Sequence, residues 1–406
     1  MSYIEGITAA DSASTDAFGR WRTSDTGQRL DVEFLYNKQD EYFDEITNGA
    51  SATVTFNGGG RDLTLDVNST TNGEYACMRS YPVPYTPGNS QLIDITGVLD
   101  LTGIGGGTAQ IFVRSNVTGS AVETVTDQSS WIAATSGVDW TDSHIFQMDF
   151  QSLKVGRIRF NLVQNGLPVN VLTINNDNVR NVGYWQIANG SVYWRIYNDA
   201  TYTYMEIGYG NENNAIGFRY KITANATATM KAICCTVKSE GGLDLRNLPG
   251  LPRSINNGVT SVTASTTRVP ILSIRPKTTF LTYENLILAI PKSFGISTDQ
   301  DIRIDIMHDV TLTNATTPTW ADVDSTESMM EYCVDATGTT NGHVVYSEYF
   351  TGGSGKSQQV SANGILGKTV LWDRQGSETG ILTIAAIRTS TSDASVFASL
   401  NWEELR

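Results

Sequence analysis

Apolar and polar residues alternate at a period of two over most of this chain, and this pattern constrains the fold more than any other feature. Residues 52–56 and 63–67 show it on either side of the turn Asn57–Gly60, and residues 146–150 and 158–162 show it again. Such alternation is typical of strands with one buried face. No long stretch keeps the 3.6-residue period of a helix. The sequence therefore predicts an all-β fold.

Turn signals divide the alternating runs and indicate how they pair. Gln164-Asn165-Gly166 lies between two apolar runs, and Asn-Gly is the strongest short-range signal for a β-hairpin. Many short strands separated by turns are typical of sandwiches and jelly rolls. A chain of 406 residues is longer than one core usually needs. We therefore expect two β-sandwich, jelly-roll-like domains.

The domain limits follow from composition. Residues 241–258 are rich in glycine and proline and lose the strand pattern, which indicates a linker. The predicted organisation is an extended N-terminal docking arm at 1–29, a first β-sandwich at 30–243, a linker at 244–262 and a second β-sandwich at 263–406.

The charge and the cysteines restrict the partners and the compartment. The net charge of −14 argues against nucleic-acid binding, which needs clustered lysine and arginine. No apolar run is long enough to span a membrane, so membrane insertion is not expected. The N-terminus lacks the basic and apolar regions of a signal peptide. Four cysteines are present, and free thiols made in a reducing cytoplasm are favoured over disulfides.

An apolar and cationic cluster lies near the N-terminus, in a segment that has no pattern for packing on itself. The cluster contains Phe18, Arg20, Trp21 and Arg22. Burying a Phe and a Trp on a partner contributes on the order of 2–3 kcal/mol each. We expect these residues to dock on another protein; the alternative is that they pack on their own sandwich.

Residues 182–222 are dense in aromatic side chains. The favoured interpretation is that these rings fill the sandwich core and its cross-strand pairs. The alternative is a face that stacks on a glycan or a protein partner. The candidates for that face are Tyr184, Trp185, Tyr193, Trp194 and Tyr197.

Catalytic and metal-binding signals are absent from the sequence. His144, His308 and His343 have no metal-ligand spacing, and His308, beside Asp309, is expected to be an exposed polar residue. No Gly-x-Ser-x-Gly motif supports a nucleophilic serine. The sequence predicts no catalytic residue, no cofactor and no metal.

Acidic pairs were considered for a glycan hydrolase, which needs two carboxylates across a cleft. Glu331 with Asp335, and Asp322 with Asp324, lie in loop-like segments and are better explained as solvated surface acids. Asn175–Asn178 lacks the acid spacing and the glycine of a calcium loop. These patterns favour a protein that is not an enzyme.

Several distinctive blocks follow one another along the chain, beginning with Ser14-Thr-Asp-Ala-Phe-Gly-Arg20 and the acidic and aromatic segment Tyr36–Glu45. The first of these resembles the opening block of a family of structural proteins of tailed-bacteriophage virions, and the order of the blocks is similar to that family's. Residues 85–92 are similar to its Pro-Gly-Lys-Ser-Gln turn, with Asn89 in place of the lysine. The blocks 231–242 and 398–405 are similar to the ends of two regions. The chain departs from the pattern at 103–108, where a glycine-rich loop replaces an insert with a Gly-Tyr-Phe-Asp motif.

The resemblance implies a structural, non-enzymatic component of the virion, assembled in the cytoplasm of the bacterial host. We expect a tail- or baseplate-associated protein, of fibre or adaptor type, that self-associates and docks onto other virion proteins. The alternatives are a capsid-decorating protein and a carbohydrate-binding module that recognises a host surface glycan. A glycan hydrolase is the least favoured alternative.

Overall fold

Two units of β-sheet, Met1–Leu245 and Arg246–Arg406, make up the chain. The computed structural model describes residues 26–405, apart from 68–71, 86–88, 102–103, 105, 116–121, 133–137, 152–153, 178–182, 188, 241–249, 315–316, 354–356, 362–368 and 374–379. The predicted docking residues Phe18, Arg20, Trp21 and Arg22 lie outside the described residues.

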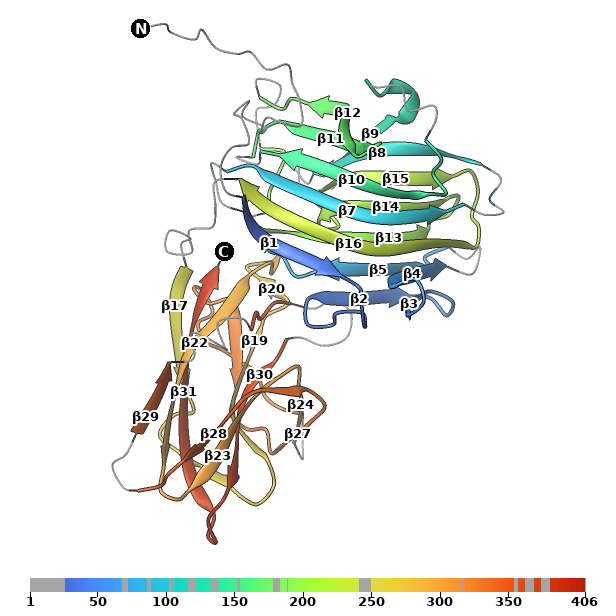
Figure 1. Ribbon diagram of the computed structural model, residues 1–406. Coiled ribbons are helices and arrows are strands. Elements are labelled where there is room, and N and C mark those ends of the chain that lie inside the picture. The colour runs from blue at the N-terminus through green and yellow to red at the C-terminus, as the bar shows by residue number, and fades with distance from the viewer. Residues whose placement is uncertain are drawn as a thin grey trace, which may run out of the picture. The chain divides into compact units, whose positions relative to one another are not determined.

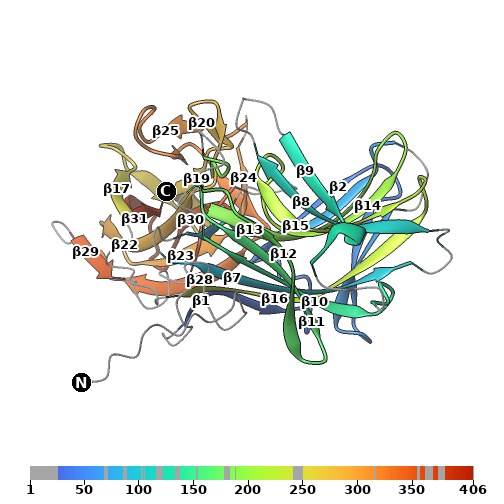
Figure 2. The same cartoon turned by 90° about the horizontal axis from the view of Figure 1, so that it is seen from above.

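The first unit contains two large antiparallel sheets, which lie face to face (Figures 1 and 2). One, the β16 sheet, has the spatial order β12 (Leu167–Ile174), β11 (Ile158–Gln164), β10 (Ser143–Phe150), β7 (Gln91–Asp100), β16 (Ala228–Glu240), β4 (Asp62–Val67) and β3 (Thr53–Asn57), with β1 (Thr26–Glu33) paired to β16. The other, the β14 sheet, has the order β2 (Phe43–Asn48), β5 (Tyr75–Ser80), β13 (Asn189–Asn198), β14 (Thr203–Gly210), β15 (Ala215–Ile222), β8 (Gly107–Ser115) and β9 (Val122–Asp127), with β6 (Val83–Pro84) paired to β13.

The core of this unit is formed by the inward-facing residues of both sheets. Trp194 of the β14 sheet and Ile95 and Val237 of the β16 sheet belong to one cluster and are fully buried. Phe34 and Phe43 pack against Trp194, with ring centroids 5.7 and 6.0 Å from it. Burial of each such side chain contributes roughly 1.5–3 kcal/mol. Because alternate residues of a strand point to the same face, the period-two alternation places these side chains between the two sheets.

Both predicted hairpins are present. β3 and β4 pair across the turn at Asn57, and β11 and β12 pair across Asn165 and Gly166. Asn165 and Gly166 have φ angles of 52° and 76°. Positive φ at both central residues of a two-residue loop is the reason that Asn-Gly is favoured there.

The second unit is also built from antiparallel sheets. Its β31 sheet has the order β17 (Gly250–Asn256), β31 (Ala394–Leu405), β22 (Leu288–Thr298) and β29 (Ser357–Ser361), with β18 (Val262–Ala264) paired to β31. Its β30 sheet has the order β25 (Ala321–Asp322), β26 (Met330–Cys333), β19 (Val269–Pro276), β30 (Leu382–Arg388), β23 (Ile302–His308) and β28 (His343–Phe350). Two two-stranded sheets complete it: the hairpin of β20 (Thr279–Phe280) with β21 (Tyr283–Glu284), and the pair of β24 (Thr311–Thr313) with β27 (Gly338–Thr340), which are separated in the chain by β25 and β26.

The second unit has a core of its own, to which both sheets contribute. Leu400 and Trp402 of β31 lie in the same buried cluster as Ile304 of β23 and Ile384 of β30. The all-β prediction is therefore confirmed for both units, and the residues shared by each cluster explain why the sheets pack in pairs.

Two predicted boundaries are wrong in detail. Thr26–Arg29, assigned to the arm, already belong to β1, and Gly250–Asn256, assigned to the linker, form β17. Pro252 suggested a break in structure, but β17 is an edge strand that pairs with β31 alone among the described strands. A proline is tolerated in an edge strand because its missing N–H removes no ladder bond on the open side.

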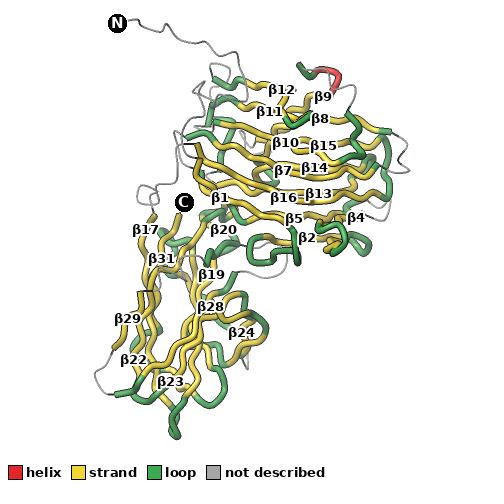
Figure 3. Tube along the Cα trace, in the orientation of Figure 1, coloured by secondary structure: helices red, strands yellow, loops and turns green. Residues whose placement is uncertain are grey.

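Helix is nearly absent from the described residues, as Figure 3 shows. A single 3₁₀ turn, η1 (Gln128–Ser130), follows β9. Within the described segments, no helix has the length and apolar character needed to cross a membrane.

Candidate functional site

Four of the five aromatic residues considered for a glycan or partner face lie inside the first unit. The exposed fractions of Tyr184, Trp185 and Trp194 are 0 to 1%, and that of Tyr193 is 4%. Trp185 stacks on Tyr209 at 6.1 Å between ring centroids. Tyr184, Trp185 and Trp194 belong to the core of this unit, in agreement with the favoured interpretation, and Tyr193 is buried on the outer face of the β14 sheet under Arg195. The alternative of a face that stacks on a ligand is left with Tyr197 alone.

Tyr197 belongs instead to a row of half-buried tyrosines on the outer face of the β14 sheet. In the strand register Tyr197 lies opposite Tyr75 of β5 on one side and Tyr204 of β14 on the other. The rings of Tyr197 and Tyr204 stack at 4.9 Å. Tyr202 is also half-buried, and the ammonium group of Lys221 lies 3.7 Å from its ring centroid. We call Tyr75, Tyr197, Tyr202 and Tyr204 the tyrosine row.

Next to the tyrosine row, three arginines surround one buried carboxylate. Arg195 of β13 and Arg219 of β15 lie opposite Glu206 of β14 in adjacent strands, so all three side chains point to the outer face. Arg195 Nε donates to Glu206 Oε2 at 3.0 Å, and Arg114 Nη2 donates to Oε1 at 3.2 Å. Glu123 of β9 pairs with Arg114 at 2.7 Å and with Arg219 at 2.8 Å. We call these five residues the arginine cluster.

The three arginines of this cluster are buried by aromatic rings although they lie on the outer face. A Cβ added at Gly208 would lie 2.7 Å from Tyr193 Oη, and one added at Gly217 would lie 2.9 Å from Phe112 Cζ. The Tyr193 and Phe112 rings therefore lie close over two strand positions without side chains. Arg195 covers the Tyr193 ring at 5.5 Å and Arg114 covers the Phe112 ring at 5.1 Å, which explains how three cations remain 8% exposed.

The electrostatics of the arginine cluster do not suit acid catalysis. Burial alone raises the pKa of Glu206, but Arg195, Arg114 and Arg219 outweigh burial and hold this pKa at about 2. The general acid of a glycoside hydrolase needs the opposite shift, a pKa raised toward neutrality. Glu206 is therefore ionised at neutral pH, and its role in this arrangement is to neutralise the guanidinium groups.

A second surface feature is a groove of about 530 Å³ along β1, lined by residues 28–33, Leu35, Gln39, Tyr42 and Tyr81. Among the described strands, β1 pairs with β16 alone. Two of its carbonyls accept side-chain hydrogen bonds: that of Arg29 from Tyr81 Oη at 2.7 Å and that of Glu33 from Gln39 Nε2 at 3.4 Å. We call this feature the β1 groove. Its first lining residues, Gln28 and Arg29, are the last two residues of the predicted docking arm.

The aromatic alternation of β13 could be predicted from the sequence, but the arginine cluster could not. Its members lie on five different strands, and only the register of those strands brings them together. Arg195, which lies between Tyr193 and Tyr197, was the one available signal, because it shows that the face shared by these three residues carries a charge.

No protein-family profile matches the sequence, and no curated protein matches it. Solved structures with a similar arrangement include a seed lectin of Lotus tetragonolobus, at 10% identity, 52% coverage of this chain, 98% of that chain and a TM-score of 0.22. An endo-1,3-beta-glucanase from Streptomyces sioyaensis is 8% identical, with 53% of this chain and 96% of that chain covered and a TM-score of 0.23. The N-terminal CBM22-1-CBM22-2 tandem domain from Paenibacillus barcinonensis is 10% identical, with 97% of this chain and 98% of that chain covered and a TM-score of 0.22. TM-scores this low carry no argument about ligand or activity.

Proposed function

We infer that this chain is a non-enzymatic structural protein of a tailed-phage virion, associated with the tail or baseplate and acting by self-association and docking. The observation that carries this proposal is the ordered set of sequence blocks from Ser14–Arg20 to 398–405 that resemble such proteins. The two β-sandwich units are consistent with it, because an assembly subunit works through rigid surfaces and burial of area.

The arm and the β1 groove together make the docking region in this proposal. The arm supplies Phe18 and Trp21 as apolar anchors, and the groove supplies an open strand edge with two exposed apolar side chains. Leu35 is 38% exposed and Tyr42 is 44% exposed. Open strand edges that carry apolar groups are ready sites for pairing with another chain.

The test compares incorporation into phage particles. Deletion of residues 1–24 and the substitution Tyr42→Asp should each leave a folded protein that enters particles at reduced copy number, because each removes apolar docking area. Tyr283→Asp is the matched control, since Tyr283 is a 76%-exposed tyrosine of the second unit. Copy number is measured by quantitative mass spectrometry of purified particles.

Normal incorporation of both variants would show that the arm and the β1 groove are not the anchor. An unfolded deletion variant would show instead that the arm packs on its own sandwich. Circular dichroism of each purified variant separates these two outcomes.

A carbohydrate-binding module is the second candidate function, and the tyrosine row is the observation that favours it. Half-buried rings beside Lys221 combine apolar stacking surface with a cation. This pairing suits an acidic glycan. In that case binding to host surface glycans should be saturable and should be lost in Tyr202→Ala without loss of stability.

A further inference from the structure

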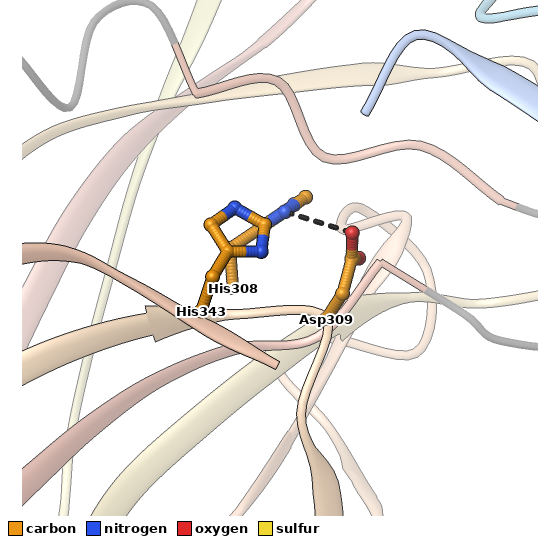
Figure 4. A group of neighbouring side chains, drawn as sticks. All are labelled: His308, Asp309 and His343. Carbon is orange, nitrogen blue, oxygen red and sulfur yellow. Dashed lines mark ion pairs between the residues drawn. The ribbon is translucent and has the colours of Figure 1, made fainter. Parts of the chain in front are cut away.

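His308, Asp309 and His343 meet at one end of the β30 sheet, in the second unit (Figure 4). His308 ends β23 and His343 begins β28, and the two histidines lie opposite each other in the antiparallel register. Their ring centroids are 5.5 Å apart. The proximity of the two histidines could not be predicted from the sequence, because they lie far apart in the chain and become neighbours only through the pairing of β23 with β28.

Two tight turns hold this group together. Asp309 has a φ of 57°, and Asn341 and Gly342 have φ angles of 57° and 71°. A Cβ added at Gly342 would lie 2.6 Å from Val310 Cγ1 and 2.8 Å from the carbonyl oxygen of His308. The turn before His343 therefore packs directly on the residues around Asp309, and a glycine is needed for that close approach.

The burial of His308 is the opposite of what the sequence predicts. This side chain was expected to be an exposed polar residue, but His308 is 3% exposed. Its Nδ1 lies 3.1 Å from Asp309 Oδ2, and its Nε2 has no hydrogen-bond partner among the described residues. Nδ1 of His308 and Oδ2 of Asp309, the two atoms of this pair that face each other, are both able to bind a metal ion.

The distances suit a metal ion. One ligand atom from each of the three residues lies within 4.8 Å of the other two. Tetrahedral Zn²⁺ with bonds of about 2.0–2.2 Å places its ligand atoms about 3.3–3.6 Å apart. His308 and Asp309 already have nearly this separation. His343 is exposed, so its side chain has room to close the remaining distance.

We propose that His308, Asp309 and His343 form a binding site for a divalent first-row transition metal ion such as Zn²⁺. Two imidazoles and one carboxylate are a common N/O ligand set for such ions, and a fourth position remains for water or a partner's ligand. The ion would join the start of the edge strand β28 to the turn that follows β23. This site is independent of the docking region and of the tyrosine row, which lie in the first unit.

The test uses the full-length chain, stripped of metal with a chelator and titrated at neutral pH with Co²⁺ as a spectroscopic probe and then with Zn²⁺. The wild type should bind a single equivalent of Co²⁺ with saturable d–d absorption, and Zn²⁺ should displace it. His343→Ala should lower the affinity roughly tenfold or more, because a ligand is lost. Asp309→Asn should also weaken binding, while asparagine still tolerates the left-handed backbone at this position.

The chain provides a matched control, because His144 is the remaining histidine of the sequence and lies in the first unit. His144→Ala should bind Co²⁺ like the wild type. The proposal is overturned if the wild type gives no saturable Co²⁺ signal, or if His343→Ala and Asp309→Asn bind Co²⁺ as tightly as His144→Ala. Since His343 is exposed, its variant should keep the fold, and circular dichroism checks this.

Discussion

Glu206 is a carboxylate that forms ion pairs with three arginines of the first unit. It is fully buried, and three guanidinium groups hold its pKa at about 2, below the usual value of 4.5. A carboxyl with a lowered pKa in the folded state stabilises the fold at pH values above the unfolded-state pKa. That contribution is lost as the pH falls from about 4.5 toward 2.

We therefore expect Glu206→Gln to destabilise the first unit at neutral pH by on the order of 3 to 5 kcal/mol, because it leaves buried guanidinium groups without their counter-charge. The difference in unfolding free energy between wild type and variant should shrink as the pH is lowered from 5 to 3, because the unfolded wild type takes up a proton at Glu206 in this range and the variant does not. Urea unfolding over this pH range measures both effects.

Glu403→Gln is the matched control for this prediction. Glu403 forms a 2.9 Å ion pair with Lys292, in which both side chains are more than one-third exposed. An exposed pair of this kind contributes about 0–1 kcal/mol. A difference for Glu206→Gln that is as small as the control, or that stays constant with pH, would contradict the electrostatic account.

At the scale of single residues, the sequence could predict which face a side chain occupies but not what it contacts. Period-two alternation places Tyr193 and Arg195 on one face and Trp194 on the other. The partners of Arg195 depend on β14 and β15, whose register is not encoded locally. His308 shows the same limit: its burial is caused by β28 and β30, which lie beside it in the sheet.

Among the strands and turns, hairpins were predicted best, because an Asn-Gly turn and its flanking strands are close in sequence. A substitution at Gly166 tests whether the backbone conformation of this turn stabilises the hairpin. Its φ is 76°, and no atom lies within 4 Å of an added Cβ, so Gly166→Ala introduces backbone strain without a clash. We expect a loss of about 1 kcal/mol in unfolding free energy, measured by urea unfolding.

Gly58 in the β3–β4 turn provides the comparison. It is not among the glycines with positive φ, and an added Cβ would meet Phe56 at an ordinary 3.7 Å. Gly58→Ala should change the stability by less than about 0.5 kcal/mol. Equal effects of the two substitutions would show that turn conformation does not limit the β11–β12 hairpin.

The edge strands were predicted less well. Residues 250–256 contain Pro252 and were assigned to a linker, but they form β17, and Thr26–Arg29 of the predicted arm belong to β1. Each of these strands pairs with one long neighbour, β17 with β31 and β1 with β16. The residues of β1 and β17 by themselves do not indicate which strand they pair with.

At the scale of the whole molecule, the all-β class and the division into two units could be predicted from periodicity and composition. The first unit ends at Leu245, close to the predicted 243. Function follows less directly, because neither unit carries a sequence motif that names a reaction. The proposal of a virion protein therefore rests on the sequence blocks that resemble phage structural proteins.

Immunogold labelling of intact phage particles with an antibody to this chain tests that claim most directly. We expect gold particles at the tail or baseplate, and Tyr42→Asp particles should carry fewer of them than Tyr283→Asp particles. Label on the capsid surface would replace the tail assignment with capsid decoration. Particles that carry no label, and from which the chain is absent by mass spectrometry, would contradict the virion proposal itself.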